Sequence, residues 1–388
     1  MSGLATPRLP ADRPLRLVQV GAGGMGRNWL RTIAASEAAE LVGVVDLNLD
    51  TARAALADLT AGGADDVVLG TSVAEVAARA GADAVVNVTV PAAHRVVNEE
   101  ALFAGLPVLC EKPAAPTVAE ALRQAAAARA AGQLLMISQS RRYFAALDAL
   151  VGQVGQLGEI GAVDCGFFKA PHFGGFREEM DHVLLVDMAV HHFDAARRVI
   201  GADPVSVYCE EHNPGWSWYR GAANAQAVFE FDGGARLTYS GSWCAPGLET
   251  SWNGQWRISA ERGTALWDGD NAPTVHVPGA GEGVAGAGST AAGAGEPRQA
   301  EVVPREQEIA GALAEFIDCL RTGRSPETEA AENLRSLAMV EAAVASAESG
   351  ERVRIDDVLI ASLREALAAE DRPEVRAHVE GLVTLPVG

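Results

Sequence analysis

The chain has 388 residues, of which 48% are hydrophobic, and its 31 Lys and Arg against 51 Asp and Glu give a formal net charge of −20. This length predicts two domains with a large buried core. The acidic balance disfavours nucleic acid and anionic membranes as partners, because both are bound by clustered Lys and Arg. No apolar run approaches the roughly 18 residues of a spanning helix. The five cysteines are scattered, and residues 1–14 lack the apolar segment of a secretory signal, so we expect a cytoplasmic globular protein.

Short apolar runs alternate with Ala-rich helical segments in the first 140 residues. The runs are rich in Val, Ile and Leu without polar alternation, which is typical of strands buried on both faces. They cover residues 15–20, 41–46, 84–90, 106–110 and 134–138. The helical segments cover residues 25–35, 50–60, 72–80, 92–104 and 117–131. This alternation predicts an α/β domain over residues 15–140 with a doubly wound parallel sheet.

The pattern changes near residue 155, where longer runs alternate polar and apolar residues. Asp232-Gly233-Gly234 lies between two such runs and is a hairpin signal. We expect a second α/β domain over residues 141–370, with a large, open, mostly antiparallel sheet. Residues 278–298 are interpreted as a low-complexity surface loop, and residues 1–14 and 371–388 as tails. The expected strands cover 160–169, 225–232, 235–243 and 255–261, and the expected helices cover 184–200, 305–322, 328–349 and 355–370.

A glycine motif follows the first predicted strand. Residues Gly21, Gly23 and Gly26 match G-x-G-x-x-G, with Gly24 and Met25 between them. The match alone is weak, because the glycine-rich segment 278–298 contains a second one. Only the first match follows a strand and opens a helix, and it precedes Asp46 at the end of the second strand.

Glycines in this setting allow close approach of a pyrophosphate, and the acid accepts the ribose hydroxyls. The motif therefore predicts dinucleotide binding, and an ordinary tight strand–helix turn is the alternative. The charge of Asp46 favours NAD and leaves NADP as the alternative, because a 2′-phosphate would be repelled.

Other polar residues follow the predicted strands 84–90 and 106–110. Thr89, Pro91 and His94 lie just beyond the first, and Glu111 and Lys112 follow the second. Ligands collect at the carboxyl ends of parallel strands. Lys112 is therefore a candidate for contact with a substrate oxygen, and the alternative is a solvated loop cation paired with Glu111.

Asp187 and His191 are four residues apart in a predicted helix, and Asp194 extends the same face. A histidine oriented by a carboxylate is a candidate general base. The alternatives are that Asp187 is a helix N-terminal acid and that His191 or His192 is a half-buried structural histidine. A metal site would need further ligands that the sequence does not clearly supply, so we expect none.

These motifs occur together with Arg141-Arg142-Tyr143-Phe144 and Leu157-Gly158-Glu159-Ile160, in an order that resembles the glucose–fructose oxidoreductase, inositol dehydrogenase and rhizopine-catabolism (Gfo/Idh/MocA) family. The resemblance extends over residues 15–200 by motif, and Glu111-Lys112-Pro113 is its most specific mark. It implies a Rossmann domain, a C-terminal sheet domain that forms homodimers or homotetramers, and hydride transfer between nicotinamide and a sugar or cyclitol hydroxyl carbon.

The resemblance also assigns roles by position. It implies that His191 takes the hydroxyl proton, that Asp187 orients and stabilises His191, and that Lys112 binds the substrate oxygen. Ala189 stands where relatives usually carry glycine, and residues 211–256 fit no subfamily, so the substrate stays open. The implied cofactor-binding residues are Gly21, Gly23, Gly24, Met25, Gly26, Asp46, Thr89, Pro91, His94, Glu111, Lys112 and Arg141, and the implied substrate-binding residues are Lys112, Tyr143, His172, Asp187 and His191.

Six of the seven tryptophans fall within residues 216–267. Their rings either stack on the apolar face of a sugar or aglycone, or pack the sheet and its subunit contact. Three functions stay open: an NAD-dependent sugar, glycoside or cyclitol dehydrogenase; an enzyme whose bound NAD oxidises its substrate only transiently; and a dinucleotide sensor. Retention of Lys112, Asp187 and His191 favours an enzyme.

Overall fold

The computed structural model describes residues 9, 11–59, 66–278 and 297–383, and the chain divides into two compact units. The first comprises residues 1–140, 306–337 and 359–388, and the second comprises residues 141–305 and 338–358. The prediction that 141–370 form one domain is therefore wrong for its last part, because the chain returns to the first unit after residue 305. The predicted loop 278–298 and tail 1–14 lie mostly outside the described residues. Within these residues, no helix is long and apolar enough to cross a membrane.

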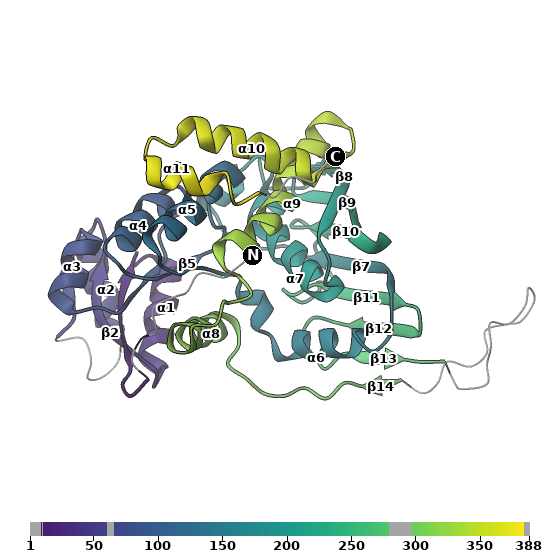
Figure 1. Ribbon diagram of the computed structural model, residues 1–388. Coiled ribbons are helices and arrows are strands. Elements are labelled where there is room, and N and C mark those ends of the chain that lie inside the picture. The colour runs from purple at the N-terminus through teal and green to yellow at the C-terminus, as the bar shows by residue number, and fades with distance from the viewer. Residues whose placement is uncertain (1–8, 10, 60–65, 279–296, 384–388) are drawn as a thin grey trace, which may run out of the picture. The chain divides into compact units, whose positions relative to one another are not determined.

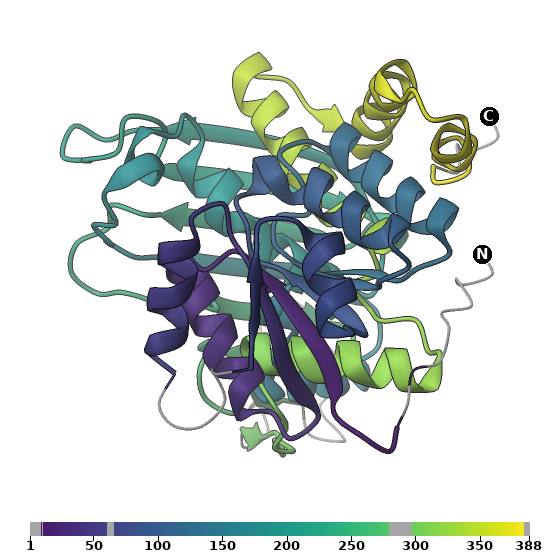
Figure 2. The ribbon, with the colours of Figure 1, turned by 90° about the vertical axis from the view of Figure 1, so that its left-hand side faces the viewer.

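The first unit contains a six-stranded parallel sheet in the order β3-β2-β1-β4-β5-β6. Helices lie on both sides of these strands in Figure 2, which confirms the predicted doubly wound fold. The sequence pattern missed β3, whose three residues are too few to form an apolar run. The strands are β1 Leu15–Val20, β2 Ala39–Val45, β3 Val68–Gly70, β4 Ala84–Asn87, β5 Val108–Glu111 and β6 Leu135–Ser138.

Polar caps define where three of the helices of this unit begin. Asn48, Ser72 and Thr117 each accept a hydrogen bond from the first turn of the helix that they precede, and each of those turns contains an acidic residue, which favours the positive end of the helix dipole. The helices are α1 Gly24–Ala35, α2 Leu49–Ala57, α3 Val73–Ala80, α4 Pro91–Phe103, α5 Val118–Ala131, α8 Glu308–Thr322 and α11 Pro373–Val379, while α9 Ala330–Ser349 and α10 Ile355–Ala369 continue from one unit into the other.

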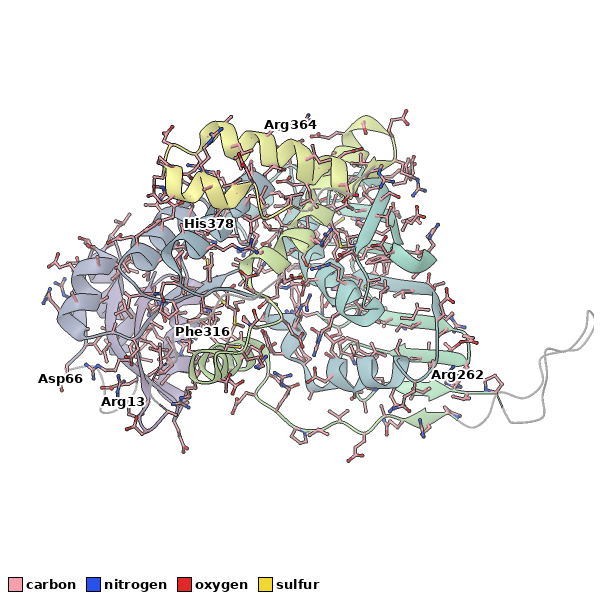
Figure 3. All side chains as sticks on the ribbon, in the orientation of Figure 1. Arg13, Asp66, Arg262, Phe316, Arg364 and His378 are labelled. Atoms are coloured by element: carbon pink, nitrogen blue, oxygen red, sulfur yellow. The ribbon has the colours of Figure 1, made fainter. Side chains whose placement is uncertain are left out.

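The C-terminal helices complete the core of the first unit. Phe316 of α8, labelled in Figure 3, is fully buried. The interpretation of residues 371–388 as a tail is wrong for its described part, because α11 packs on α5 (Figure 1). Val375 and Val379, four residues apart, are fully buried, so a seven-residue helix is held by its apolar stripe.

The second unit contains a nine-stranded sheet in the order β14-β13-β12-β11-β7-β10-β9-β8-β15, which Figure 1 shows from β8 to β14. Its pairs are antiparallel except β10 with β7, so the predicted mostly antiparallel sheet is confirmed. Asp232–Gly234 join β9 to β10 as predicted. The strands are β7 Ile160–Phe168, β8 Pro204–His212, β9 Asn224–Phe231, β10 Arg236–Ser242, β11 Gln255–Ala260, β12 Gly263–Trp267, β13 Thr274–His276, β14 Arg298–Gln299 and β15 Val353–Arg354.

Helix α7 (Val190–Ile200) covers one face of this sheet. The Phe193 ring meets the rings of Phe229 and Tyr239 edge-on at centroid distances of 4.7 and 5.2 Å. The other helices of the unit are α6 (Ala145–Val154), the 3₁₀ turns η1 (Ser140–Tyr143) and η2 (Gly175–Glu179), and the π-helical turn η3 (Leu184–Ala189). The core of the second unit therefore lies between α7 and the inward face of the sheet.

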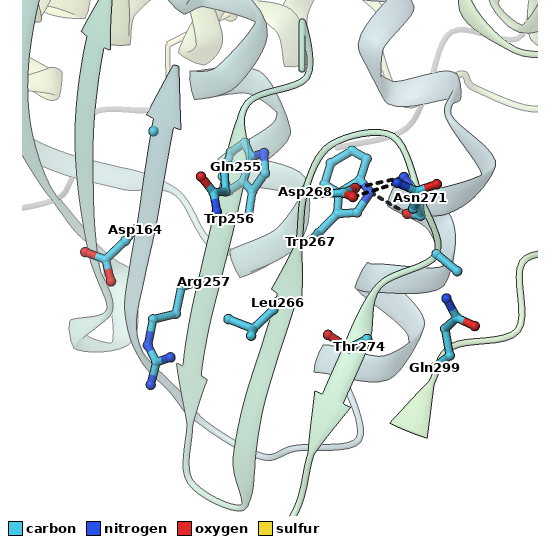
Figure 4. A pocket seen from close by; sticks show the side chains of 12 residues that line it. Asp164, Gln255, Trp256, Arg257, Leu266, Trp267, Asp268, Asn271, Thr274 and Gln299 are labelled. Atoms are coloured by element: carbon cyan, nitrogen blue, oxygen red, sulfur yellow. Dashed lines mark hydrogen bonds between the residues drawn. The ribbon is translucent and has the colours of Figure 1, made fainter. Parts of the chain in front are cut away.

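The opposite face of the sheet carries a hollow of about 660 Å³ (Figure 4). Asp164, Arg257 and Leu266 line it from three adjacent strands. Because side chains alternate along a strand, these residues point away from the face that α7 covers. At one end of the hollow, Asn271 donates to Asp268 through its main-chain and side-chain nitrogens.

A buried ion pair ties α7 to the start of the second unit. The guanidinium of Arg142 donates to Asp194 through two nitrogens, at 2.6 and 3.0 Å, and both side chains are buried. Removing one partner leaves the other buried charge without this compensation.

We therefore expect Asp194→Asn to lower the free energy of unfolding by about 3–5 kcal/mol, measured as a fall in the urea midpoint. Arg53→Gln removes one partner of the exposed Arg53–Asp50 pair and should change stability by less than about 0.5 kcal/mol. Equal midpoints for the two variants would contradict the assignment of Arg142–Asp194 as a structural pair.

Candidate functional site

The glycine motif forms a turn in which backbone groups approach closely. Gly21 adopts a φ of +94°, and a Cβ there would lie 2.7 Å from the Val88 carbonyl oxygen. A Cβ on Gly26 would lie 2.4 Å from the Gly21 carbonyl oxygen. These two positions therefore require glycine for the turn itself.

Gln19 supports this turn from inside the sheet. Its side-chain nitrogen donates to the carbonyl oxygens of Gly21 and Gly26 at 2.8 and 2.9 Å, and the side chain is fully buried. Gln19 was not among the predicted site residues. A polar residue within the otherwise apolar run 15–20, directly before the glycines, was the available signal.

The N-terminus of α1 differs from those of α2, α3 and α5. Its N-cap residue, Gly23, makes no side-chain hydrogen bond, and its first turn contains no acid. A Cβ on Gly23 or Gly24 would meet nothing within 4 Å. Uncapped N–H groups at the positive end of a helix, with open space in front of them, form an anion site. This site lies where the strand order reverses between β1 and β4, which is the ligand-binding edge of such sheets.

Asp46 follows β2 on the other side of the turn. One carboxylate oxygen accepts from the amide of Ala22 and the other from the amide of Asn48, both at 2.8 Å. The two bonds fix the orientation of the carboxylate, and each oxygen retains a lone pair for a further donor. This geometry suits the two hydroxyls of a ribose.

Gln139, directly after β6, was also missed. Its side chain is buried, yet neither its amide oxygen nor its amide nitrogen has a hydrogen-bond partner within the described part of the chain. Such an amide fits a ligand that offers both a donor and an acceptor, as a nicotinamide carboxamide does. Together with Asp46 and the free N–H groups of α1, it makes the first unit fit NAD.

Two predicted cofactor-binding residues are instead buried in the interior. The Glu111 carboxylate accepts from the Trp29 indole at 2.7 Å and from the Lys112 amide at 3.0 Å. Burial raises the pKa of Glu111, and these bonds oppose that rise. Glu111 therefore shapes the turn that carries the half-buried Lys112, and its contact with the cofactor stays a prediction.

His94 links the turns that follow β4 and β5. It is fully buried, with Nδ1 2.9 Å from the Pro113 carbonyl oxygen and Nε2 3.0 Å from that of Thr89. Burial lowers the pKa of His94 against the effect of these contacts, which favours a neutral ring with one N–H. Any effect of His94 on a cofactor is therefore expected to act through the two turns.

Buried amides reinforce the same link. The side chain of Asn87 donates to Asn98, which donates to Gln124, which in turn donates to the Ala114 carbonyl. The Asn87 oxygen accepts from the amide and hydroxyl of Thr89. The turns that carry Thr89 and Lys112 therefore have a common buried support.

In the second unit, Asp187 lies in the π-helical turn η3 and His191 in the first turn of α7. The expected helix 184–200 therefore begins with a π-helical turn, in which the backbone bonds i to i+5, and continues as α-helix. That Asp187 and His191 share one face stays a prediction. His191 is buried, and the Asp187 carboxylate accepts from Nε of Arg177 at 2.7 Å. Arg177 was not predicted, since no local motif links it to Asp187.

His192 is buried against aromatic rings, and its ring centroid lies 4.7 Å from that of Phe167. Burial lowers the pKa of His192 to about 3, so this histidine is neutral at pH 7. The Asp194 carboxylate is paired with the guanidinium of Arg142. Of the two adjacent histidines, His191 remains the candidate base.

The remaining predicted residues make contacts within the second unit. Arg141 donates to the side chain of Asn253 at 3.2 Å, and the Tyr143 ring is buried below the Arg305 guanidinium. His172 is exposed and stacks on Trp218 with 3.8 Å between centroids. Their contacts with cofactor or substrate stay predictions.

The tryptophans divide between the two expected roles. Trp243, Trp256 and Trp267 are buried in the core, whereas Trp216 and Trp252 are 67% and 37% exposed. Packing therefore explains the first three, and the exposed rings remain available to a ligand.

Substitutions of Gly26 and Gly23 distinguish the folding of the glycine turn from its binding of an anion. We expect Gly26→Ala to lower the melting temperature, because its Cβ would clash with a backbone oxygen. Gly23→Ala should leave the melting temperature unchanged and weaken NADH binding by about tenfold or more, measured by fluorescence titration. Unchanged NADH affinity in Gly23→Ala would contradict the anion site.

Substitutions of His94 test which nitrogen carries its proton. We expect His94→Ala to cost about 1–3 kcal/mol, because the buried carbonyl that accepts the ring N–H loses its donor, in addition to the cavity. His94→Asn returns a donor near Nδ1 and His94→Gln returns one near Nε2, and we expect one of them to recover more of this loss than the other. Urea unfolding measures both. Greater recovery by Asn assigns the proton to the Pro113 contact, greater recovery by Gln assigns it to the Thr89 contact, and equal recovery would contradict a single ring N–H.

Comparison with known proteins agrees with this geometry. Residues 15–139 match the family described as "Oxidoreductase family, NAD-binding Rossmann fold", and residues 144–266 match the "GFO/IDH/MocA C-terminal domain". An uncharacterised protein of Sinorhizobium fredii, y4oX, is 30% identical over 89% of this chain and 96% of its own.

Inositol 2-dehydrogenase 4 of Saccharopolyspora erythraea is 30% identical over 70% of this chain and 78% of its own. A solved oxidoreductase from Agrobacterium radiobacter, in complex with NAD⁺, L-tartaric acid and magnesium, has the same fold, with a TM-score of 0.76 and 20% identity over 88% of this chain and 99% of its own. The chain therefore belongs to the Gfo/Idh/MocA family of oxidoreductases, with an NAD-binding Rossmann domain followed by the C-terminal domain of that family.

Proposed function

We propose that this NAD-dependent dehydrogenase is a cytoplasmic enzyme that oxidises a hydroxyl carbon of a sugar, glycoside or cyclitol. The observation that carries the proposal is the first unit's cofactor site: an uncapped α1 N-terminus opposite the fixed carboxylate of Asp46. The relative named inositol 2-dehydrogenase supports the substrate class. All five cysteines are buried free thiols, which suits a reducing compartment.

The chemistry assigned to this chain is proton transfer and positioning. In the proposal His191 accepts the proton of the substrate hydroxyl, and Asp187 stabilises the resulting imidazolium. The ammonium of Lys112 donates to the same oxygen and holds it. NAD, when bound, supplies the ring that accepts the hydride.

Asp46 supports NAD as the preferred cofactor over NADP. A 2′-phosphate carries up to two negative charges and would meet a carboxylate that is held in place by two amides. We expect NADPH to bind more weakly than NADH, with the difference reduced in Asp46→Ser.

The proposal includes a homodimer or homotetramer formed through the outward face of the nine-stranded sheet. Val228 and Leu266 lie on that face beside polar residues such as Asp164 and Arg257. A mixture of apolar and polar side chains is typical of non-obligate interfaces. Light scattering that gives the molar mass of a single chain would contradict the proposed homodimer or homotetramer.

Activity measurements test the proposal directly. With NAD and a panel of sugars and cyclitols, we expect steady NADH formation, followed by its absorbance. His191→Ala and Asp187→Asn should lower kcat by about 10²–10⁴-fold and change NADH affinity by less than about threefold. His212→Ala, a change at an exposed histidine of β8, is the matched control and should retain kcat.

Two results would contradict the proposal. Full turnover in His191→Ala would remove the proposed base. Substrate conversion without net NADH formation would point to transient oxidation by bound NAD.

A further inference from the structure

Arg177 occupies an unusual position beside Asp187. It lies in the 3₁₀ turn η2, between β7 and the π-helical turn that carries Asp187. Its guanidinium carbon is 5.2 Å from the ring centroid of Phe173 and 4.9 Å from that of Phe176. Its Nε donates to the Asp187 carboxylate at 2.7 Å. Two rings and one ion pair therefore fix the guanidinium before any ligand binds.

The contact with Asp187 uses only one edge of the guanidinium. Among the residues that the structure describes, the two terminal nitrogens of Arg177 have no hydrogen-bond partner, and the side chain is 36% exposed. These two nitrogens, the Arg177 fork, carry N–H donors in one plane that match the two oxygens of a carboxylate. Because the Arg177 fork is already held in place, little conformational entropy is lost when it binds such a group.

Nearby cations and an amide offset part of the acidic charge around Arg177. Arg220 pairs with both Glu179 and Asp181, and Lys169 pairs with Glu249. The Glu178 carboxylate accepts from the amide of Gly174. A carboxylate at the Arg177 fork would therefore meet partly neutralised charges. A single fork also suits a planar carboxylate better than a phosphate, since phosphate sites usually gather several donors.

Exposed rings lie next to the fork. Phe173 and Phe176 are 45% and 64% exposed, and the centroid of Phe173 lies 6.5 Å from that of the exposed Trp252. Large rings left in solvent beside a charged fork provide an apolar surface for the carbon face of a sugar ring. The combination suits a molecule that is apolar on one face and carries an anionic group at its end.

We propose that Arg177 binds a carboxylate of the substrate, so that the preferred substrate is a sugar acid of the uronate type. The inference rests on the proposed function only in taking Asp187 to act at the reacting carbon. Arg177 is then a specificity-determining residue, and its fork selects the acid over the corresponding neutral sugar.

Matched substrate pairs test this inference. D-Galacturonate and D-galactose, and D-glucuronate and D-glucose, differ only in the carboxylate, so the ratio of their kcat/KM values isolates its recognition. We expect the wild-type protein to favour the acid by roughly 10- to 100-fold. Arg177→Gln should abolish this ratio, mainly by raising KM for the acid, and Arg177→Lys should retain part of it.

The ratio of kcat/KM values is also insensitive to a change at Asp187. Loss of the guanidinium leaves Asp187 without this partner and changes kcat for both members of a pair. Because both values change by the same factor, their ratio does not. Arg236→Gln, which removes an exposed cation of β10 that pairs with Glu230, is the control and should leave the ratio unchanged. A wild-type ratio near one, or a ratio that Arg177→Gln does not alter, would overturn the inference while leaving the dehydrogenase intact.

Calorimetry separates this inference from the proposed function. We expect D-galacturonate to bind the NADH-loaded protein and to lose at least about tenfold in affinity in Arg177→Gln. Binding that depends on Arg177 without oxidation of any sugar would support the carboxylate site and contradict the proposed function. Equal binding by both proteins would contradict the carboxylate site.

Discussion

The close approach of the Gly21 carbonyl to Gly26 is the constraint on which the first unit's site depends. No side chain fits between these two backbone segments, so α1 begins immediately after β1 and directs its N–H groups across the carboxyl edge of the sheet. The side chain of Gln19 donates to the carbonyl oxygens of Gly21 and Gly26. The Asp46 carboxylate accepts from the amide of Ala22, the residue after Gly21. The anion site is therefore a property of the backbone, and the surrounding polar side chains hold that backbone in place.

A second buried network of polar side chains holds the two turns that carry Thr89 and Lys112. His94 and the amides of Asn87, Asn98 and Gln124 connect the turns after β4 and β5. Polar groups in such a network are costly when one is left unpaired. His94 resembles a cofactor ligand in the sequence, whereas in the structure both of its ring nitrogens lie within 3.0 Å of backbone carbonyl oxygens of these turns.

The sequence predicts the parallel sheet well and the second unit's site poorly, for physical reasons. Continuous Val and Leu runs mark β1, β4 and β5 because these strands are buried on both faces. The three-residue β3 and the seven-residue α11 are held by tertiary packing and carry too few residues for a periodic signal. Neither the π-helical turn at Asp187 nor its ion pair with Arg177 has a local sequence signature. The helical pattern of residues 184–200 does not reveal the change from π- to α-helical bonding, and the ion pair joins two turns ten residues apart. The roles expected for Asp187 and His191 come from the family resemblance alone, and the structure adds the ion pair between Asp187 and Arg177.

In the proposed reaction the enzyme transfers a hydride from a substrate carbon to NAD. A substrate deuterated at every carbon-bound position, with mass analysis of the reduced cofactor, follows this transfer. We expect NADH that carries one deuterium and a slower turnover than with the protiated substrate. Turnover in which the cofactor gains no deuterium would rule out direct hydride transfer.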